Sequence, residues 1–308
     1  MMLEFVGRVA IVTGAGNGVG RAYAEFLAKQ GAKVLVNDLG GDITGLNQVV
    51  DRGIAAQLAD AINDAGGEAL FNADSVAEFQ TAAQMVEQAM DSWGRIDIVI
   101  NNAGIVGDEL FPNVSAEQMH HNLDVHVLGC LHTIQAAWPT MQAQNYGRII
   151  NTASNSAFGF TSGLAYPSMK SAVFALTNNI ALQTHDQDIN VNTILPAAFT
   201  RMSAGLPASS MRDKLERDFG PEMLAPAVAY LCHESSTISG QAFSIGGGKL
   251  ARVVFAATES VEFDQGMESA GQALQHVMQA PAGRIYNSTL DDLANLGFDS
   301  DELSLFTG

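Results

Sequence analysis

Residues 8–20 read Arg-Val-Ala-Ile-Val-Thr-Gly-Ala-Gly-Asn-Gly-Val-Gly. The run from Arg8 to Thr13 is rich in β-branched residues and predicts a buried strand, and the helical pattern after the glycines ends at Gly31. The glycines between strand and helix let the backbone turn sharply and approach a pyrophosphate at the helix N-terminus. Their spacing, Gly-x-x-x-Gly-x-Gly, differs from the Gly-x-Gly-x-x-Gly fingerprint. A glycine turn directly after a strand nevertheless favours a dinucleotide site over an ordinary loop.

The same alternation of strand and helix recurs along most of the chain. Further strand-like runs lie at residues 33–37, 68–73, 96–100, 148–152, 189–195 and 241–245. Helical periodicity separates most of them, for example over residues 75–93 and 115–141. Apolar strands that alternate with helices imply a parallel sheet covered on both faces, with ligands at the carboxyl ends of the strands. We therefore predict an α/β fold with a Rossmann-type doubly wound parallel sheet.

A C-terminal region follows the last predicted strand of this sheet. It contains a strand-like run at 252–257, a helical pattern at 266–279 and an acidic end at 290–303. No linker-like composition separates it from the preceding chain. We predict that residues 1–248 form the nucleotide-binding domain and that residues 249–308 form an extension packed on that core.

The composition is that of a globular, strongly acidic protein. Of the 308 residues, 47% are hydrophobic and 16% are charged, and the net charge is -18 at pH 7. This charge repels polyanions, which argues against nucleic acid and against a membrane as partners. No apolar stretch approaches the roughly 18 residues of a membrane span, and residues 1–8 show no secretory leader. We expect a cytoplasmic protein.

The sequence does not indicate a metal site. Cys130 and Cys232 stand far apart within apolar helical patterns, which favours two packed thiols over a disulfide or a metal site. The seven histidines are scattered, and no Cys/His cluster has zinc spacing.

Short polar residues follow the predicted strands, where a dinucleotide would lie. Asp38 ends the second strand, and its carboxylate can accept hydrogen bonds from both adenosine ribose hydroxyls and repel a 2′-phosphate. We therefore predict NAD rather than NADP, with a solvated loop aspartate as the alternative. Asp74 follows the third strand, within reach of the adenine. The predicted cofactor-binding residues of this half are Gly14, Asn17, Gly18, Val19, Gly20, Asp38, Asp74, Asn102, Ala103 and Gly104.

Two further segments are expected to lie at the predicted cofactor site. Asn101 and Asn102 follow the fourth strand, and their amides either contact the cofactor or satisfy open strand ends. Residues 39–51 form a longer link than the usual 2 to 6 residues or so between strand and helix, and we interpret them as a loop over the adenosine.

Tyr166 and Lys170 stand four residues apart, twelve residues after Ser154. A phenol has an ordinary pKa of about 10, and an ammonium one helical turn away favours its ionised form. Such a pair can take a proton from an alcohol while a nearby cofactor takes the hydride. These residues predict a redox enzyme.

Together, the glycine turn, residues 101–104, Ser154, Tyr166 and Lys170 resemble the short-chain dehydrogenase/reductase family over about residues 5–248. The resemblance implies that Tyr166 is the acid/base. It further implies that Lys170 lowers the pKa of Tyr166 and binds the nicotinamide ribose, and that Ser154 hydrogen-bonds the reacting oxygen. Tyr166 and Lys170 thereby join the cofactor-binding residues, as do Pro196 and Thr200 after the sixth strand.

Three positions depart from the family pattern. The gap from Ser154 to Tyr166 is twelve residues where thirteen is usual. Ser154 is the preferred residue to hydrogen-bond the reacting oxygen, and Ser156 is the second choice. His126 stands at the family's catalytic Asn and is either a holder of a relay water or a structural residue, while Asn122 one turn earlier is another relay candidate. The usual Pro-Gly after the sixth strand is Pro196-Ala197.

Other segments resemble a narrower branch, the (3R)-hydroxyacyl-CoA dehydrogenase units of peroxisomal multifunctional enzymes. They are residues 37–42, 125–126, 147–150 and 231–235. The branch implies a 3-hydroxyacyl-CoA or a hydroxysteroid as substrate. Four basic residues would suit CoA phosphates, but interleaved acids equally allow an ordinary surface helix. They are Arg201, Arg212, Lys214 and Arg217.

Three functions remain open at this point. The first is an NAD-dependent dehydrogenase of a 3-hydroxyacyl-CoA, the second is a dehydrogenase of a hydroxysteroid or another bulky alcohol, and the third is a non-catalytic NAD-binding scaffold. The expected partner is a small-molecule substrate, and the family resemblance implies a homodimer or homotetramer that pairs through helices at about 115–141 and 164–184.

Overall fold

The computed structural model of the chain describes residues 3–45, 51, 53–107, 109–161, 163–184, 186–204 and 207–299. The chain divides into two compact units, Met1–Arg252 and Val253–Gly308. Each unit is described separately below.

The first unit is built around an eight-stranded sheet of order β3-β2-β1-β4-β5-β6-β7-β8. Its strands are β1 (Val9–Thr13), β2 (Lys33–Asn37), β3 (Glu68–Asn72), β4 (Ile98–Asn101), β5 (Gly147–Thr152), β6 (Ile189–Pro196), β7 (Ala242–Gly246) and β8 (Lys249–Val253). Every pair from β3 to β7 is parallel. The strand order reverses between β1 and β4, and such a switch point is where ligands bind in doubly wound sheets. The predicted fold is confirmed.

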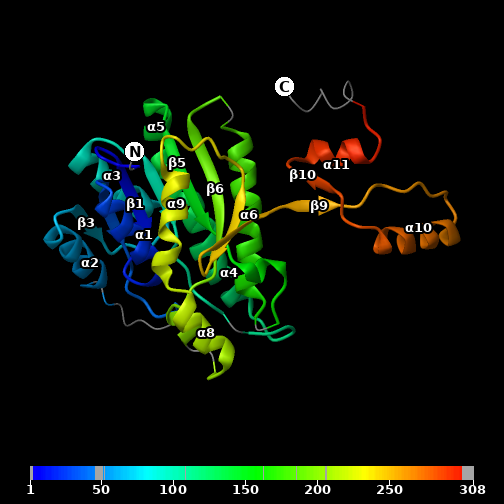
Figure 1. The fold of residues 1–308 in the computed structure, drawn as a ribbon, viewed down its shortest axis with the longest axis horizontal. Coiled ribbons are helices and arrows are strands. Elements are labelled where there is room, and N and C mark those ends of the chain that lie inside the picture. The colour runs from blue at the N-terminus through cyan, green and yellow to red at the C-terminus, as the bar shows by residue number, and fades with distance from the viewer. Residues whose placement is uncertain are drawn as a thin grey trace. The chain divides into compact units, whose positions relative to one another are not determined.

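Helices cover both faces of this sheet (Figure 1). They are α1 (Gly18–Lys29), α2 (Gly53–Asp64), α3 (Phe79–Trp93), α4 (Ala116–Leu123), the π-helical turn η1 (Asp124–Leu128), α5 (Gly129–Gln144), α6 (Ala165–Leu182) and α9 (Ala225–Cys232). Side chains alternate along β1, so Ala10 and Val12 join a core with α1, α2 and α9. Val9 and Ile11 join a second core with α3 and α5.

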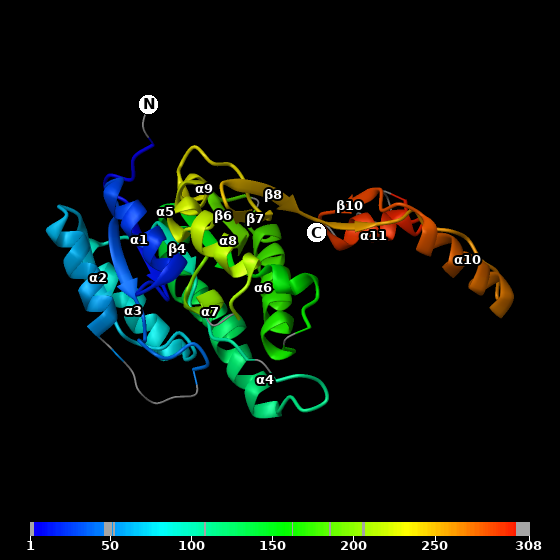
Figure 2. The same ribbon diagram turned by 60° about the horizontal axis from the view of Figure 1, so that its bottom comes forward.

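Shorter elements gather where the parallel strands end. They are η2 (Asn155–Phe158), α7 (Arg201–Ala204), α8 (Ser210–Asp218) and η3 (Pro221–Met223). Figure 2, in which this end of the sheet comes forward, shows α4, α7 and α8 around it. The candidate site therefore lies among these short helices, at the edge of the sheet where the parallel strands end.

The second unit is small and has no core of its own. It consists of β9 (Phe255–Ala257), α10 (Met267–Gln279), β10 (Arg284–Tyr286) and α11 (Thr289–Asn295), and β9 and β10 pair antiparallel. None of its described residues is buried. The packing of residues 249–308 on the core stays a prediction.

Three predicted boundaries change in the structure. The strand expected at 252–257 is two strands, β8 and β9, which belong to different sheets. The helix expected from residue 75 begins at Phe79, because Ser75 instead makes local turn bonds with Ala77 and Thr81. The helix expected over 115–141 contains η1, whose wider turn no periodicity indicated.

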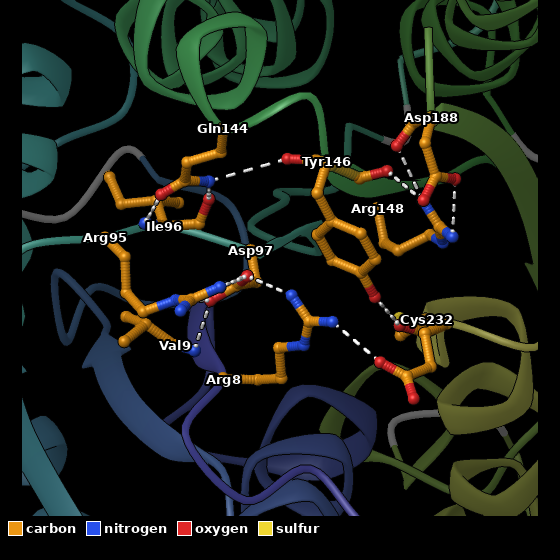
Figure 3. Close-up of polar contacts among 12 residues, drawn as sticks. Arg8, Val9, Arg95, Ile96, Asp97, Gln144, Tyr146, Arg148, Asp188 and Cys232 are labelled. Carbon is orange, nitrogen blue, oxygen red and sulfur yellow. Dashed lines mark hydrogen bonds and ion pairs between the residues drawn. The ribbon is translucent and has the colours of Figure 1, made fainter.

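A polar network closes the opposite edge of the sheet, where the strands begin (Figure 3). The carboxylate of Asp97 is fully buried and accepts hydrogen bonds from Arg8, from Arg95 and from the backbone N–H of Val9. The ring of Tyr146 lies between two guanidinium groups, 3.9 Å from that of Arg8 and 4.3 Å from that of Arg148.

Candidate active site

A pocket opens at the switch point between β1 and β4. Nine of the ten cofactor-binding residues that the sequence predicts before residue 105 line this pocket. Thr200, from the segment after β6, lines it as well. The lining residues that the sequence predicted are Gly14, Asn17, Gly18, Val19, Asp38, Asp74, Asn102, Ala103, Gly104 and Thr200. Gly20 does not line the pocket. A Cβ there would collide with Asn102 and with the carbonyl oxygen of Gly14, so Gly20 serves close packing of helix on strand.

The glycine turn fits a ligand that approaches the backbone closely. Gly14 and Gly18 have φ of 61° and 57°, a region that glycine adopts readily. A Cβ on Gly14 would lie 2.7 Å from the Cα of Ala103, and one on Gly16 would lie 2.8 Å from the carboxylate of Asp38. The turn precedes α1, whose first N–H groups point out of the helix. The residues present therefore suit the pyrophosphate of a dinucleotide.

Asp38 is held rigidly at the pocket wall. One carboxylate oxygen accepts the N–H of Gly16 and the other accepts the N–H of Gly40, each at 2.8 Å. The side chain is buried rather than solvated. Each carboxylate oxygen can accept a further hydrogen bond, so the group remains able to bind ribose hydroxyls.

The asparagines after β4 bond mainly to the protein. The amide of Asn102 donates to the carbonyl oxygens of Thr13 and Gly14, which ties β4 to the glycine turn. Asn101 bridges Asn151 on β5 and Thr133 on α5. Their amides thus hold the pocket wall in place, and Asn102, Ala103 and Gly104 line the pocket.

The loop after Asp38 also lines the pocket, as predicted for residues 39–51. Its described lining residues are Leu39, Gly41, Asp42, Ile43 and Gly45. Ile43 accepts a backbone hydrogen bond from Val106, which draws the loop across to the segment after β4. Residues 46–50 and 52 lie outside the described residues.

Several lining residues were not predicted from the sequence. His121 and Val125 come from α4 and η1, Ser75 to Ala77 follow β3, and Arg201 begins α7. Only the fold brings these segments to the switch point, because nothing in their local pattern differs from that of packed helix or loop residues. Arg201 is one of the four basic residues for which the sequence leaves both CoA phosphates and an ordinary surface helix open, and it lines this pocket instead.

Ser154, Tyr166 and Lys170 come together at the end of β5 and the start of α6, and none of the three is among the residues that line this pocket. The side chains of Ser154 and Tyr166 are hydrogen-bonded. The Lys170 ammonium lies 5.7 Å from the centre of the Tyr166 ring and donates to the carbonyl oxygen of Thr152 at 2.6 Å. The structure thus pairs the tyrosine with Ser154, whereas Ser156 leaves its hydroxyl buried and without a partner.

Burial dominates the ionisation of this group. It raises the pKa of Tyr166, and the hydrogen bond from Ser154 only partly opposes that change. It lowers the pKa of Lys170 to about 8. The prediction that Lys170 brings the pKa of Tyr166 below its ordinary value is therefore wrong for the polypeptide by itself, because desolvation penalises both charged forms.

The two relay candidates occupy different surroundings. His126 is fully buried in η1, and its ring meets the ring of Tyr166 edge-on with 5.3 Å between the ring centres. Asn122 is equally buried, but its amide donates to the carbonyl oxygen of Gln118 on its own helix. Only His126 contacts the catalytic group directly.

The remaining predicted positions are less central. Pro196 ends β6 and does not line the pocket. Arg217 pairs with Asp218 on the exposed helix α8, as the surface-helix interpretation expects. Cys130 and Cys232 are buried free thiols. Among the described residues, no three His, Cys, Asp or Glu side chains are grouped as metal ligands, and no helix is long and apolar enough to cross a membrane.

Comparison with known proteins places these features in a family. The short chain dehydrogenase family matches residues 8–209. The chain is 40% identical to peroxisomal multifunctional enzyme type 2 of Mus musculus over 252 residues, which is 82% of this chain and 33% of that protein. It is 39% identical over 261 residues to a protein of Mycobacterium tuberculosis described as a short-chain type dehydrogenase/reductase, covering 84% of this chain and 88% of that one.

The fold agrees with these matches. The full-length peroxisomal multifunctional enzyme type 2 from Drosophila melanogaster superposes with a TM-score of 0.76 and 29% identity, over 96% of this chain and 49% of that one. The chain thus spans about a third to a half of the multifunctional enzymes that it matches.

Proposed function

Because the chain belongs to the short chain dehydrogenase family, we propose that it is an NAD-dependent oxidoreductase that interconverts a 3-hydroxyacyl-CoA and its 3-oxoacyl-CoA. That it is an oxidoreductase follows from the family. The single observation that carries the proposal further is the Ser154–Tyr166 hydrogen bond with Lys170 close to the Tyr166 ring, in a fold whose pocket wall holds Asp38.

The side chains act on the alcohol as follows. The Tyr166 oxygen takes the hydroxyl proton, and Ser154 donates a hydrogen bond to the substrate oxygen as it becomes a carbonyl. Lys170 stands within one turn on α6 and offers N–H donors to a ribose. A bound oxidised dinucleotide would supply the hydride acceptor and a positive charge. A nearby positive charge lowers a phenol pKa, which would offset the effect of burial described above.

The choice of NAD rests on Asp38. Its carboxylate is held by two N–H groups and keeps accepting capacity toward ribose hydroxyls. A 2′-phosphate would meet a fixed negative charge there, and such repulsion selects against NADP. Measurement of KM for both cofactors tests this assignment, which equal use of NAD and NADP would overturn.

The acyl-CoA substrate is supported by the likeness to the multifunctional enzymes. The decisive assay compares the two stereoisomers of a 3-hydroxyacyl-CoA, the same hydroxy acid without CoA, and a hydroxysteroid, each followed by the absorbance of reduced dinucleotide. Turnover of the CoA ester alone supports the proposal. Turnover of the steroid alone would assign the chain to bulky apolar alcohols, and binding of dinucleotide with no turnover at all would make it a scaffold.

The physical setting of this activity is also proposed. We expect a homodimer or homotetramer that pairs through α4, α5 and α6. The molar mass of the protein, measured by light scattering during size-exclusion chromatography, tests this expectation. A cytoplasmic location stays a prediction, since the relative from Mus musculus is named for the peroxisome. We expect no nucleic acid or membrane partner, because the net charge of -18 repels both.

A further inference from the structure

Arg201 is the only lysine or arginine among the described residues that line the pocket at the switch point. The acidic residues in the same lining are Asp38, Asp42 and Asp74. A dinucleotide brings the negative charge of its pyrophosphate to a protein whose net charge is -18. Repulsion from the protein as a whole opposes the approach of such a ligand, so a cation inside the pocket has a large influence on its binding.

The guanidinium of Arg201 has no counter-charge within the part of the chain that the structure describes. It makes no hydrogen bond and no ion pair there, although three carboxylates line the same pocket. Its side chain is exposed. Arg217, which belongs to the same basic group in the sequence, is instead paired with Asp218. A guanidinium without a protein partner keeps its N–H donors for a ligand, and their planar fork matches a phosphate.

The backbone just before Arg201 rests on the glycine turn. A Cβ on Gly18, the first residue of α1, would lie 3.3 Å from Cγ2 of Thr200. The hydroxyl of Ser203 fixes Thr200 in this place, because it accepts the Thr200 N–H at 2.7 Å and donates to the Thr200 carbonyl oxygen at 3.0 Å. Arg201 follows directly, so its backbone starts beside the N-terminus of α1.

The N-terminus of α1 is itself prepared for an anion. Asn17 precedes the helix, but its side chain makes no capping hydrogen bond, and the first turn contains no acidic residue. The first N–H groups of the helix therefore keep their capacity for an outside acceptor. The N–H of Thr200 cannot add to them, since Ser203 accepts it. Neutral donors from α1 and the cation of Arg201 thus border the same part of the pocket, where a phosphate group would be bound by both.

We propose that Arg201 pairs with the pyrophosphate of the dinucleotide and supplies the positive charge that the rest of the described pocket lacks. This assignment rests on the proposed function, because it takes NAD as the ligand of the pocket. It also separates Arg201 from the other three members of the basic group, Arg212, Lys214 and Arg217, which belong to α8 and do not line the pocket. The ligand of Arg201 is then the dinucleotide rather than CoA.

Calorimetric titration with three ligands isolates the contribution of the pyrophosphate. NADH carries the pyrophosphate and the nicotinamide, ADP-ribose keeps the pyrophosphate without the nicotinamide, and adenosine has neither. The dissociation constant of each ligand is measured for the wild type, Arg201→Gln and Arg201→Lys. Arg217→Gln removes the same charge from the exposed face of α8 and is the matched control.

We expect Arg201→Gln to weaken the binding of NADH and of ADP-ribose about tenfold or more, because a charge-assisted hydrogen bond is lost, and to leave adenosine binding unchanged. Arg201→Lys keeps the charge and should lose less affinity. The difference between wild type and Arg201→Gln should shrink as salt is raised from about 0.01 M to about 1 M, since salt screens an exposed ion pair. Arg217→Gln should bind all three ligands like the wild type.

Several results would overturn the role of Arg201. They are unchanged affinity for NADH and ADP-ribose in Arg201→Gln, an equal loss for adenosine, and an Arg201→Lys variant no better than Arg201→Gln. Unchanged dinucleotide affinity together with a raised KM for the acyl-CoA would assign Arg201 to the substrate instead.

Failure of the proposed function gives a different result. A wild type that binds NADH but oxidises no alcohol would refute the dehydrogenase activity, while the titrations would still establish the pairing of Arg201 with the pyrophosphate. A wild type that binds neither NADH nor ADP-ribose would overturn both.

Discussion

The two edges of the central sheet treat buried polar groups in opposite ways. Where the strands begin, Asp97 is saturated by two guanidinium groups and a backbone N–H (Figure 3). Where they end, His126, Asn122 and Ser156 keep buried atoms without any partner. Saturated groups have nothing left to offer a ligand, whereas unsaturated ones raise the energy of the free protein and lower that of a complex. We infer that the first edge stabilises the fold, and we propose that the second carries out the reaction.

The network at the amino edge also joins distant parts of the chain. Arg8 connects Asp97 to Glu234, and Tyr146 donates to the carbonyl oxygen of Cys232. Arg148 pairs with Asp188 ahead of β6. Three atoms at this edge depart from the pattern, since Arg148 Nε, Gln187 Oε1 just before β6 and Ser236 Oγ have no partner. The ion pairs therefore hold β1, β4, β5 and α9 in register on the side away from the pocket.

The largest effect is expected at the reactive edge. Tyr166→Phe removes the acid/base and should lower kcat by about 10³-fold while leaving dinucleotide affinity and unfolding free energy nearly unchanged. Turnover and fluorescence titration of the reduced dinucleotide check this. Tyr230→Phe deletes the same hydroxyl from an exposed ring and is the matched control. Undiminished turnover in Tyr166→Phe would contradict the assigned base.

At the saturated edge we expect the reverse. Asp97→Asn keeps the shape of the side chain but leaves Arg95 without its counter-charge and Arg8 with only the exposed Glu234, which should cost about 3 kcal/mol of unfolding free energy. Urea unfolding measures this loss, and kcat should stay near its wild-type value. Glu234→Gln alters the exposed end of the same network and should cost less than about 1 kcal/mol. A large fall in kcat without loss of stability would show that this edge takes part in the reaction.

The buried charge of Lys170 is expected to lower the free energy of unfolding. Its folded pKa of about 8 lies below the ordinary 10.5, so between these values the folded chain binds fewer protons and stability rises with pH. Below about pH 8 the buried charge costs up to about 3 kcal/mol. Lys170→Met should therefore be inactive yet more stable than the wild type near neutral pH, an advantage that disappears toward about pH 10.5. Thermal unfolding of both proteins across this range decides the matter, and a pH-independent difference would refute it.

The smallest effect concerns the cofactor. Asp38→Asn removes the charge but keeps the size of the side chain, so NADP should gain and the ratio of kcat/KM for NAD over NADP should fall about tenfold or more. Asp74→Asn, which alters another acidic residue of the same pocket wall, should leave that ratio unchanged. A ratio that Asp38→Asn does not alter would remove the electrostatic explanation.

The regular parts of the fold were readable from local pattern. Strands such as β1 and β2 are buried on both faces, so residues 9–12 and 34–36 form continuous apolar runs that stand out against the helices. The glycine turn was equally plain, because Gly14 requires both a positive φ and the absence of a side chain. The turn η1 was not readable, since Asp124 to Leu128 continue an ordinary helical pattern and only tertiary packing inserts the wider turn.

The site was predicted in part for the same reason. The spacing of Tyr166 and Lys170 follows from one helical turn, and that of Asp38 from the end of a strand. The entry of Arg201 and His121 into the pocket depends on crossovers that join segments far apart in sequence. The sequence named His126 and Asn122 as candidates, but their buried atoms without a partner, His126 Nδ1 and Asn122 Oδ1, became visible only in the structure.

The amino-acid order alone determined which segments become strands and helices and which side chains reach the carboxyl edge, because both depend on interactions between near neighbours. The tertiary structure decided which of those side chains lose water and which find partners. Desolvation is a property of everything packed around a group, and for that reason the ionisation of Tyr166 and Lys170 differs from what their spacing predicts.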